Sequence, residues 1–156
     1  MNNDDAVVVD VFYPHPVQKV WQALTRSDAI EAWLMPNDFE PRLGRAFTFH
    51  TAPDQNWNGM VDCEVVALDE PRRLAYTWRN AATQLDTLVT FTLEPAEGGT
   101  NLRLEHTGFA KSGKAGQFAR EGLGAGWNSR VLRERLAGYL NGQPVPHGAG
   151  SAAGAA

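Results

Sequence analysis

Cysteine is nearly absent from this chain, since Cys63 is the single one among 156 residues. One thiol cannot form an intramolecular disulfide, and neither Cys63 nor the four histidines show the paired spacing of a zinc site. A chain of this length buries roughly two thirds of the surface that it exposes when unfolded, so folding requires neither a disulfide nor a metal. We predict no metal site.

Long apolar segments are also lacking. The longest uninterrupted apolar runs are a few residues, whereas about 20 are needed to span a bilayer. The N-terminus, "MNNDDAVVVDVF", has no basic segment followed by an apolar run and a cleavage site made of small residues. We therefore expect no membrane insertion and a cytoplasmic location.

Positive charge is scarce as well. The chain has 14 Lys and Arg against 18 Asp and Glu, a net charge of −4. A surface that binds nucleic acid needs a basic excess on one face, so we expect no nucleic-acid partner. Arg130, Arg133 and Arg135 are clustered late in the chain, but Glu134 interrupts them. This pattern is typical of the solvated face of a helix.

Motifs of cofactor and nucleophile sites are missing. The sequence has no GxGxxG, GxxxxGK[ST] or GxSxG, the patterns that cradle nucleotide phosphates or present a catalytic serine. Glu105 and His106 are adjacent, but neighbours on a strand point to opposite faces and cannot act together directly. We predict no cofactor and assign no catalytic residue.

What is present is an orderly series of elements. A β-branched and aromatic run at 7–13 predicts a strand, which Pro14 and Pro16 end. Two short helices in tandem are expected at 16–25 and 26–34, with apolar residues of the first at helical spacing. Short turns then separate runs with the character of antiparallel strands, beginning at residues 45, 57, 73, 86 and 100.

One long amphipathic helix is predicted at 115–140, from apolar residues at three- and four-residue spacing. Its first half contains four glycines, and because each costs about 1 kcal/mol relative to alanine in a helix, we expect that half to be flexible or bent. Residues 143–156 carry too little apolar surface to offset the entropy cost of ordering them. We therefore predict a single domain at 1–142 followed by a flexible tail at 143–156.

Apolar and polar residues alternate along the predicted strands, so one face of the sheet is expected to be apolar. Val66 and Leu68 break this alternation, which suggests a β-bulge. A curved sheet wrapped around one helix need not close onto it completely, so an internal pocket lined by aromatic residues is expected between them; a fully packed core is the alternative. Polar groups on this face help to distinguish an internal pocket from a fully packed core, because a buried polar group needs a hydrogen-bond partner. The predicted ligand-binding residues are Trp33, Phe47, Phe49, Tyr76, Trp78, Val89, Phe91, Leu104, His106 and Trp127.

Several sequence pieces occur in an order shared with a known family. They are "VWQALT" at 20–25, "AWL" with Pro36, "LGRAFTFH" at 43–50, "EPRRLAYTW" at 70–78, "VTFTLEPAEGGTNLRLEHTGF" at 89–109, and "GW" at 126–127. With them the chain resembles the START-like (SRPBCC) superfamily, and within it the family related to the C-terminal domain of the activator of the heat-shock chaperone ATPase. The resemblance implies an α+β helix-grip fold, in which a curved antiparallel sheet of about six strands wraps around a long C-terminal helix.

The same resemblance implies a cavity between sheet and helix, with its mouth formed by Trp33 and the loop to Gly44. It identifies no catalytic residue, since superfamily members include lipid carriers, polyketide cyclases and chaperone regulators. The favoured function is non-catalytic binding of a small hydrophobic molecule, as a carrier, sensor or stress-related protein. The alternatives are a chaperone ATPase regulator, for which a chaperone is the partner, and a cyclase or hydrolase that uses His106 with Tyr76. The sequence also leaves open a homodimer, formed through the outer sheet face or an edge strand.

Overall fold

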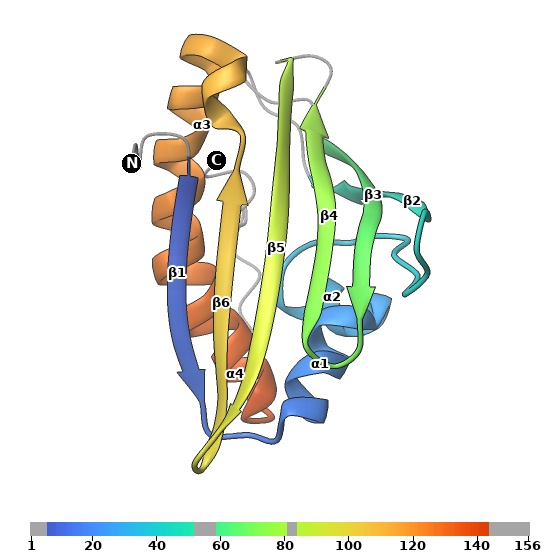
Figure 1. The fold of residues 1–156 in the computed structure, drawn as a ribbon, viewed down its shortest axis with the longest axis vertical. Helices are drawn as coiled ribbons and strands as arrows, with labels where there is room; N and C mark the ends of the chain where they lie inside the picture. The colour runs from blue at the N-terminus through green and yellow to red at the C-terminus, as the bar shows by residue number, and fades with distance from the viewer. Residues whose placement is uncertain (1–5, 52–58, 81–83, 144–156) are drawn as a thin grey trace.

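The computed structural model describes residues 6–51, 59–80 and 84–143. Residues 144–156, which make up nearly all of the predicted tail, lie outside this described part. Within it the chain forms one antiparallel sheet and a set of helices (Figure 1).

The sheet has six strands in the order β1-β6-β5-β4-β3-β2, and all neighbours are antiparallel. The sheet therefore has two edges, β1 and β2. This architecture confirms the predicted α+β fold and each predicted strand. The strands are β1 (Ala6–Tyr13), β2 (Ala46–His50), β3 (Met60–Asp69), β4 (Arg73–Asn80), β5 (Leu85–Ala96) and β6 (Gly99–Thr107).

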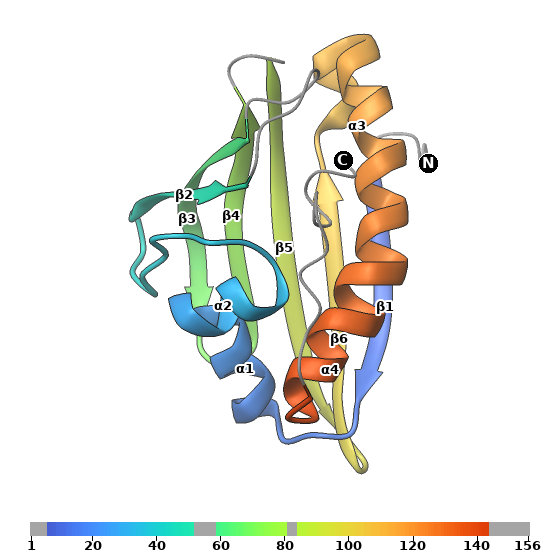
Figure 2. The ribbon, with the colours of Figure 1, turned by 180° about the vertical axis from the view of Figure 1, so that it is seen from behind.

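The helices cover one face of this sheet, as the view from behind shows (Figure 2). The two predicted short helices are α1 (Val17–Thr25) and α2 (Ser27–Trp33), and α1 contacts β5 and β6. The C-terminal helical segment runs along β1 and contacts α1 and α2 at its far end. It consists of η2 (Phe109–Ser112), α3 (Gly113–Ala125), η3 (Gly126–Leu136) and α4 (Ala137–Leu140).

Strand register brings the apolar side chains onto the face that the helices cover. Val89 lies opposite Tyr76 on one side and His106 on the other, and Phe91 lies opposite Leu74 and Leu104. All six side chains are buried. The predicted bulge is confirmed, because the register between β3 and β4 shifts between Val65 and Ala67.

The long C-terminal helix departs from the predicted geometry in an unexpected place. Its glycine-rich part, α3, is α-helical throughout, and the expectation that this half is flexible or bent stays a prediction. The following segment, η3, is instead a π-helix of 11 residues, in which each turn is closed by an i→i+5 hydrogen bond. π-helical turns are rare and occur frequently at functional sites. None of the helices formed by the described residues is long and apolar enough to cross a membrane.

Candidate functional site

Aromatic rings from the sheet, the C-terminal helical segment and the loop before β2 meet on the inner face of the sheet, and we call them the inner aromatic cluster. Tyr76 on β4 packs edge-on against Phe47 on β2, with ring centroids 5.2 Å apart. Trp78 packs against Trp127 of η3 at 5.7 Å, which joins the sheet to the helix. All members are buried. They are Phe39, Phe47, Phe49, Tyr76, Trp78, Phe91, His106, Phe109 and Trp127.

Nine of the ten residues predicted to line a cavity are on this inner face. Seven belong to the inner aromatic cluster, and the buried Val89 and Leu104 lie on the neighbouring strands β5 and β6. Trp33 is placed differently. It is buried at the end of α2, and its indole N–H donates a hydrogen bond to the Ala23 carbonyl of α1 at 2.8 Å. In the described part of the chain, its ring contacts no other aromatic ring.

Two cluster members were missed by the sequence reasoning. Phe39 lies in the irregular segment between α2 and β2, where no periodicity assigns a face, yet its ring stands 5.0 Å from that of Phe47. Phe109 follows the end of β6 and lies 4.5 Å from the ring of His106. The only sequence signal for either was the density of aromatic residues around it.

The segment before β2, predicted to be the mouth of a cavity, is held by Asn37. Its side chain donates to the Met35 and Ser27 carbonyls and accepts a hydrogen bond from the Phe39 backbone N–H. Asn37 also pairs with Phe49 through an isolated β-bridge. These contacts fix the loop against the edge strand β2 and carry Phe39 inward.

His106 is a fully hydrogen-bonded interior histidine. The Trp127 indole N–H donates to His106 Nδ1 at 3.1 Å, and because an indole nitrogen can only donate, Nδ1 carries no proton. Nε2 therefore carries the ring proton and donates it to Thr87 Oγ1 at 2.7 Å, while the Thr87 hydroxyl donates to the Trp78 carbonyl at 2.8 Å. Burial lowers the pKa of His106 to about 3. At neutral pH its imidazole is uncharged and has no free nitrogen for acid or base chemistry.

Tyr76 contrasts with His106. Its side chain is 2% exposed and is surrounded by Phe39, Phe47, Phe49 and Phe91. Among the described residues, none makes a hydrogen bond with its hydroxyl group. Burial raises the pKa of this phenol well above its ordinary value, so the hydroxyl remains a neutral donor. Tyr76 and His106 also lie in different parts of the cluster, since the rings around His106 are Trp78, Phe109 and Trp127.

The arginine cluster of the C-terminal helix does not lie entirely in solvent. Arg130 and Arg133 are exposed, as predicted, and Arg133 donates to the Asp10 carbonyl of β1. The prediction is wrong for Arg135, which is buried at 6% exposure. Its Nη1 atom is completely enclosed and has no hydrogen-bond partner.

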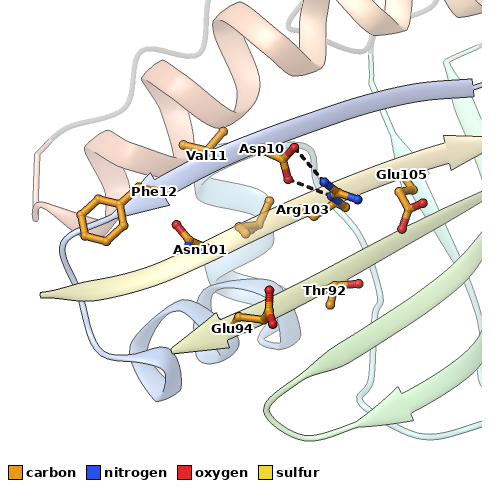
Figure 3. A pocket seen from close by; sticks show the side chains of 9 residues that line it. Asp10, Val11, Phe12, Thr92, Glu94, Asn101, Arg103 and Glu105 are labelled. Carbon is orange, nitrogen blue, oxygen red and sulfur yellow. Dashed lines mark hydrogen bonds and ion pairs between the residues drawn. The ribbon is translucent and has the colours of Figure 1, made fainter. Parts of the chain in front are cut away.

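A hollow of about 720 Å³ lies on the opposite, outer face of the sheet (Figure 3). Asp10 and Arg103 form an exposed ion pair across it, with Arg103 Nε 2.9 Å from Asp10 Oδ1. The hollow is lined by Asp10, Val11, Phe12, Thr92, Glu94, Asn101, Leu102, Arg103 and Glu105. It shares no residue with the inner aromatic cluster. In the described part of the chain, no group of three or more His, Cys, Asp or Glu side chains is placed to hold a metal ion.

Comparison with known proteins identifies relatives that share this architecture. Protein MLL2253 from Mesorhizobium loti is 39% identical; the match covers 87% of this chain and 96% of that one, with a TM-score of 0.76. DynU16, a protein in the dynemicin biosynthetic locus, is 25% identical with a TM-score of 0.75, and the match covers 90% of this chain and 49% of DynU16. CalU16 from Micromonospora echinospora shares the fold at 24% identity and a TM-score of 0.70, over 90% of this chain and 77% of CalU16.

No curated protein matches the sequence. The family model described as Activator of Hsp90 ATPase homolog 1-like protein matches residues 14–141, which include every element from α1 to α4. The fold and the order of the motifs agree with this match. The chain therefore belongs to the family of Activator of Hsp90 ATPase homolog 1-like proteins, within the START-like (SRPBCC) superfamily.

Proposed function

We propose that this protein binds a small apolar molecule between its sheet and its C-terminal helix, without catalysing a reaction, and that residues 1–142 act as one binding domain. The observation that carries the proposal is the Tyr76 hydroxyl. It is buried among aromatic rings and has no hydrogen-bond partner among the described residues. The hydroxyl is a donor that the described part of the protein leaves unused, and a guest with one acceptor atom would supply its partner.

The polar groups around His106 support this interpretation by contrast. Both nitrogens of His106, the Thr87 hydroxyl and the Trp127 N–H all have partners within the protein. Like the indole N–H of Trp78, the Tyr76 hydroxyl makes no hydrogen bond with the described residues, so Tyr76 is free to donate to a guest. Its neutral phenol suits a carbonyl, ether or hydroxyl oxygen on an otherwise apolar molecule.

Ligand entry would occur at the segment from Trp33 to Gly44. Asn37 holds this segment through side-chain hydrogen bonds rather than through a continuous strand ladder. Such a segment can open without breaking the central strands. The relative DynU16, which belongs to a biosynthetic locus, is consistent with a family scaffold that handles small molecules.

Native mass spectrometry of the freshly purified protein tests the proposal directly, through bound mass that leaves on denaturation. A second test is titration with decanol and with 2-naphthalenemethanol, followed by tryptophan fluorescence, in the wild type and in Tyr76→Phe. We expect the wild type to bind at least one probe, and the variant, which keeps the ring, to bind it about three- to tenfold more weakly. A protein that carries no passenger and binds neither probe would refute the proposal.

The family match favours a second candidate, regulation of a heat-shock chaperone ATPase through protein contact. The experiment is a chaperone ATPase assay with and without the purified protein. A change in rate that saturates with protein concentration would support this function. The inner aromatic cluster would then act only as the core.

A further inference from the structure

Arg135 is the buried cation of the C-terminal helix. It lies in η3 with 6% of its surface exposed, and its enclosed Nη1 has no hydrogen-bond partner. Among the described carboxylates, none lies within ion-pair distance of its guanidinium group. Arg45 differs in having carboxylates nearby, since its Nη2 lies 3.8 Å from oxygens of both Asp38 and Glu40, although its Nε is likewise enclosed without a hydrogen-bond partner.

The charge on Arg135 cannot be removed by deprotonation. Burial lowers the pKa of its guanidinium, as does the neighbouring Arg130, while Glu134 opposes them. An arginine nevertheless stays protonated in proteins. An enclosed donor of a charged group is unfavourable without a partner, and in Arg135 this donor is Nη1.

The position of Arg135 on the helix relates it to the inner aromatic cluster. Trp127, Val131 and Arg135 follow at four-residue spacing and are all buried, so they form one stripe along η3. Trp127 at the start of this stripe packs on Trp78 and Phe91. Arg133, by contrast, is exposed and bonded to β1.

The π-helical segment that carries Arg135 also contacts α2. α2 ends at Trp33, where the proposed mouth begins, so η3 lies beside the inner aromatic cluster through Trp127 and beside the helix that borders the mouth. A ligand lying along η3 would have its apolar body against the rings and its end near the guanidinium.

We propose that Arg135 binds the carboxylate of an amphipathic ligand whose apolar part lies against the inner aromatic cluster. This inference rests on the proposed function and adds the chemical class of the ligand, a small apolar carboxylic acid in its ionised form. A planar guanidinium matches a carboxylate with two parallel N–H···O bonds. The carboxylate would satisfy Nη1 and neutralise the buried charge.

The test compares ligands that differ only in their end group. Decanoate is paired with decanol, and 2-naphthoate with 2-naphthalenemethanol, and each is titrated calorimetrically into the full chain at pH 8. We expect the wild type to bind the carboxylate of at least one pair about tenfold more tightly than the alcohol. In Arg135→Met this preference should fall to about one, with the affinity for the alcohol unchanged.

Arg130→Met is the matched control, because it removes a positive charge from an exposed position five residues away on the same helix. It should keep the tenfold preference. Arg135→Lys keeps the charge without the planar fork, so an intermediate preference is expected, and this variant also serves if Arg135→Met does not fold.

Three outcomes would overturn the inference. If the wild type binds both members of each pair equally, or if Arg135→Met keeps the preference, Arg135 is not the carboxylate site, while the proposed binding of apolar molecules stands. If no probe of either pair binds the wild type, the proposed function fails and this inference fails with it.

Discussion

The indole N–H of Trp127 donates to Nδ1 of His106 at 3.1 Å, and this bond joins the C-terminal helix to β6 inside the core. It also determines the protonation of the histidine, since Nδ1 must be unprotonated to accept it. The imidazole is therefore held neutral both by burial and by its partners. A polar residue that resembles a candidate acid or base in the sequence acts here as a structural link between two layers.

The neutral state of His106 predicts a specific loss of stability in acid. Its pKa is about 3 in the folded protein and about 6.5 in an unfolded chain. The unfolded state therefore binds the extra proton first as the pH falls, and the stability contributed by this group, complete above pH 6.5, is lost progressively toward pH 3. At pH 5 the expected loss is about 2 kcal/mol relative to pH 7. Urea unfolding at both pH values measures it.

The control is the same measurement on His106→Gln, which does not titrate and offers an amide in place of the ring. Its loss of stability between pH 7 and pH 5 should be smaller than that of the wild type by about 2 kcal/mol, because all other groups are unchanged. His50→Gln controls for the removal of an exposed histidine. Equal losses in the wild type and in His106→Gln would show that His106 is not buried and neutral.

Thr87 completes the same network, and its hydroxyl is expected to contribute to stability. Thr87→Val keeps the shape but removes the acceptor of the His106 Nε2–H group. A buried donor that loses its acceptor costs about 1–3 kcal/mol, which chemical denaturation at pH 7 would detect. Thr92→Val on the outer face is the matched control and should change the free energy of unfolding by less than about 0.5 kcal/mol. A Thr87→Val variant as stable as the control would contradict the assigned hydrogen bonds.

The apolar face of the sheet could be predicted from the sequence, because successive side chains of a strand point to opposite faces. Tyr76, Trp78 and Phe91 fall on the apolar face by alternation alone, and the structure places all three inside. The bulge near Val66 was visible as a break in the same alternation.

The remaining features of the site have no such local signal. Phe39 is brought inward by the hydrogen bonds of Asn37, which are contacts of an irregular loop and carry no period. The burial of Arg135 was hidden because its neighbours Arg133 and Glu134 are exposed. The π-helical geometry of η3 adds to this, because it changes the spacing at which side chains share a face.

Phe39 provides a test of whether the loop before β2 belongs to the core. Replacing this buried side chain with alanine should destabilise the protein by about 3–5 kcal/mol, because it removes apolar contacts and leaves a cavity against Phe47 and Tyr76. Phe12→Ala is the matched control, since Phe12 is 47% exposed on the outer face, and a change below about 1 kcal/mol is expected there. Guanidinium chloride unfolding of both variants measures the difference. Equal effects would mean that the loop does not hold Phe39 inside.

Replacing Arg135 is expected to make the ligand-free protein more stable, whereas most substitutions of buried residues destabilise a protein. Methionine fills similar space without a charge, so Arg135→Met removes a charged group whose enclosed Nη1 has no hydrogen-bond partner and should raise the free energy of unfolding by about 1–3 kcal/mol. Arg130→Met, at an exposed position of the same helix, should leave it within about 0.5 kcal/mol of the wild type. Thermal and urea unfolding of protein freed of any passenger provide the measurement. A marked loss of stability in Arg135→Met would show that the guanidinium already has a partner within the protein, and it would then not be available to a ligand.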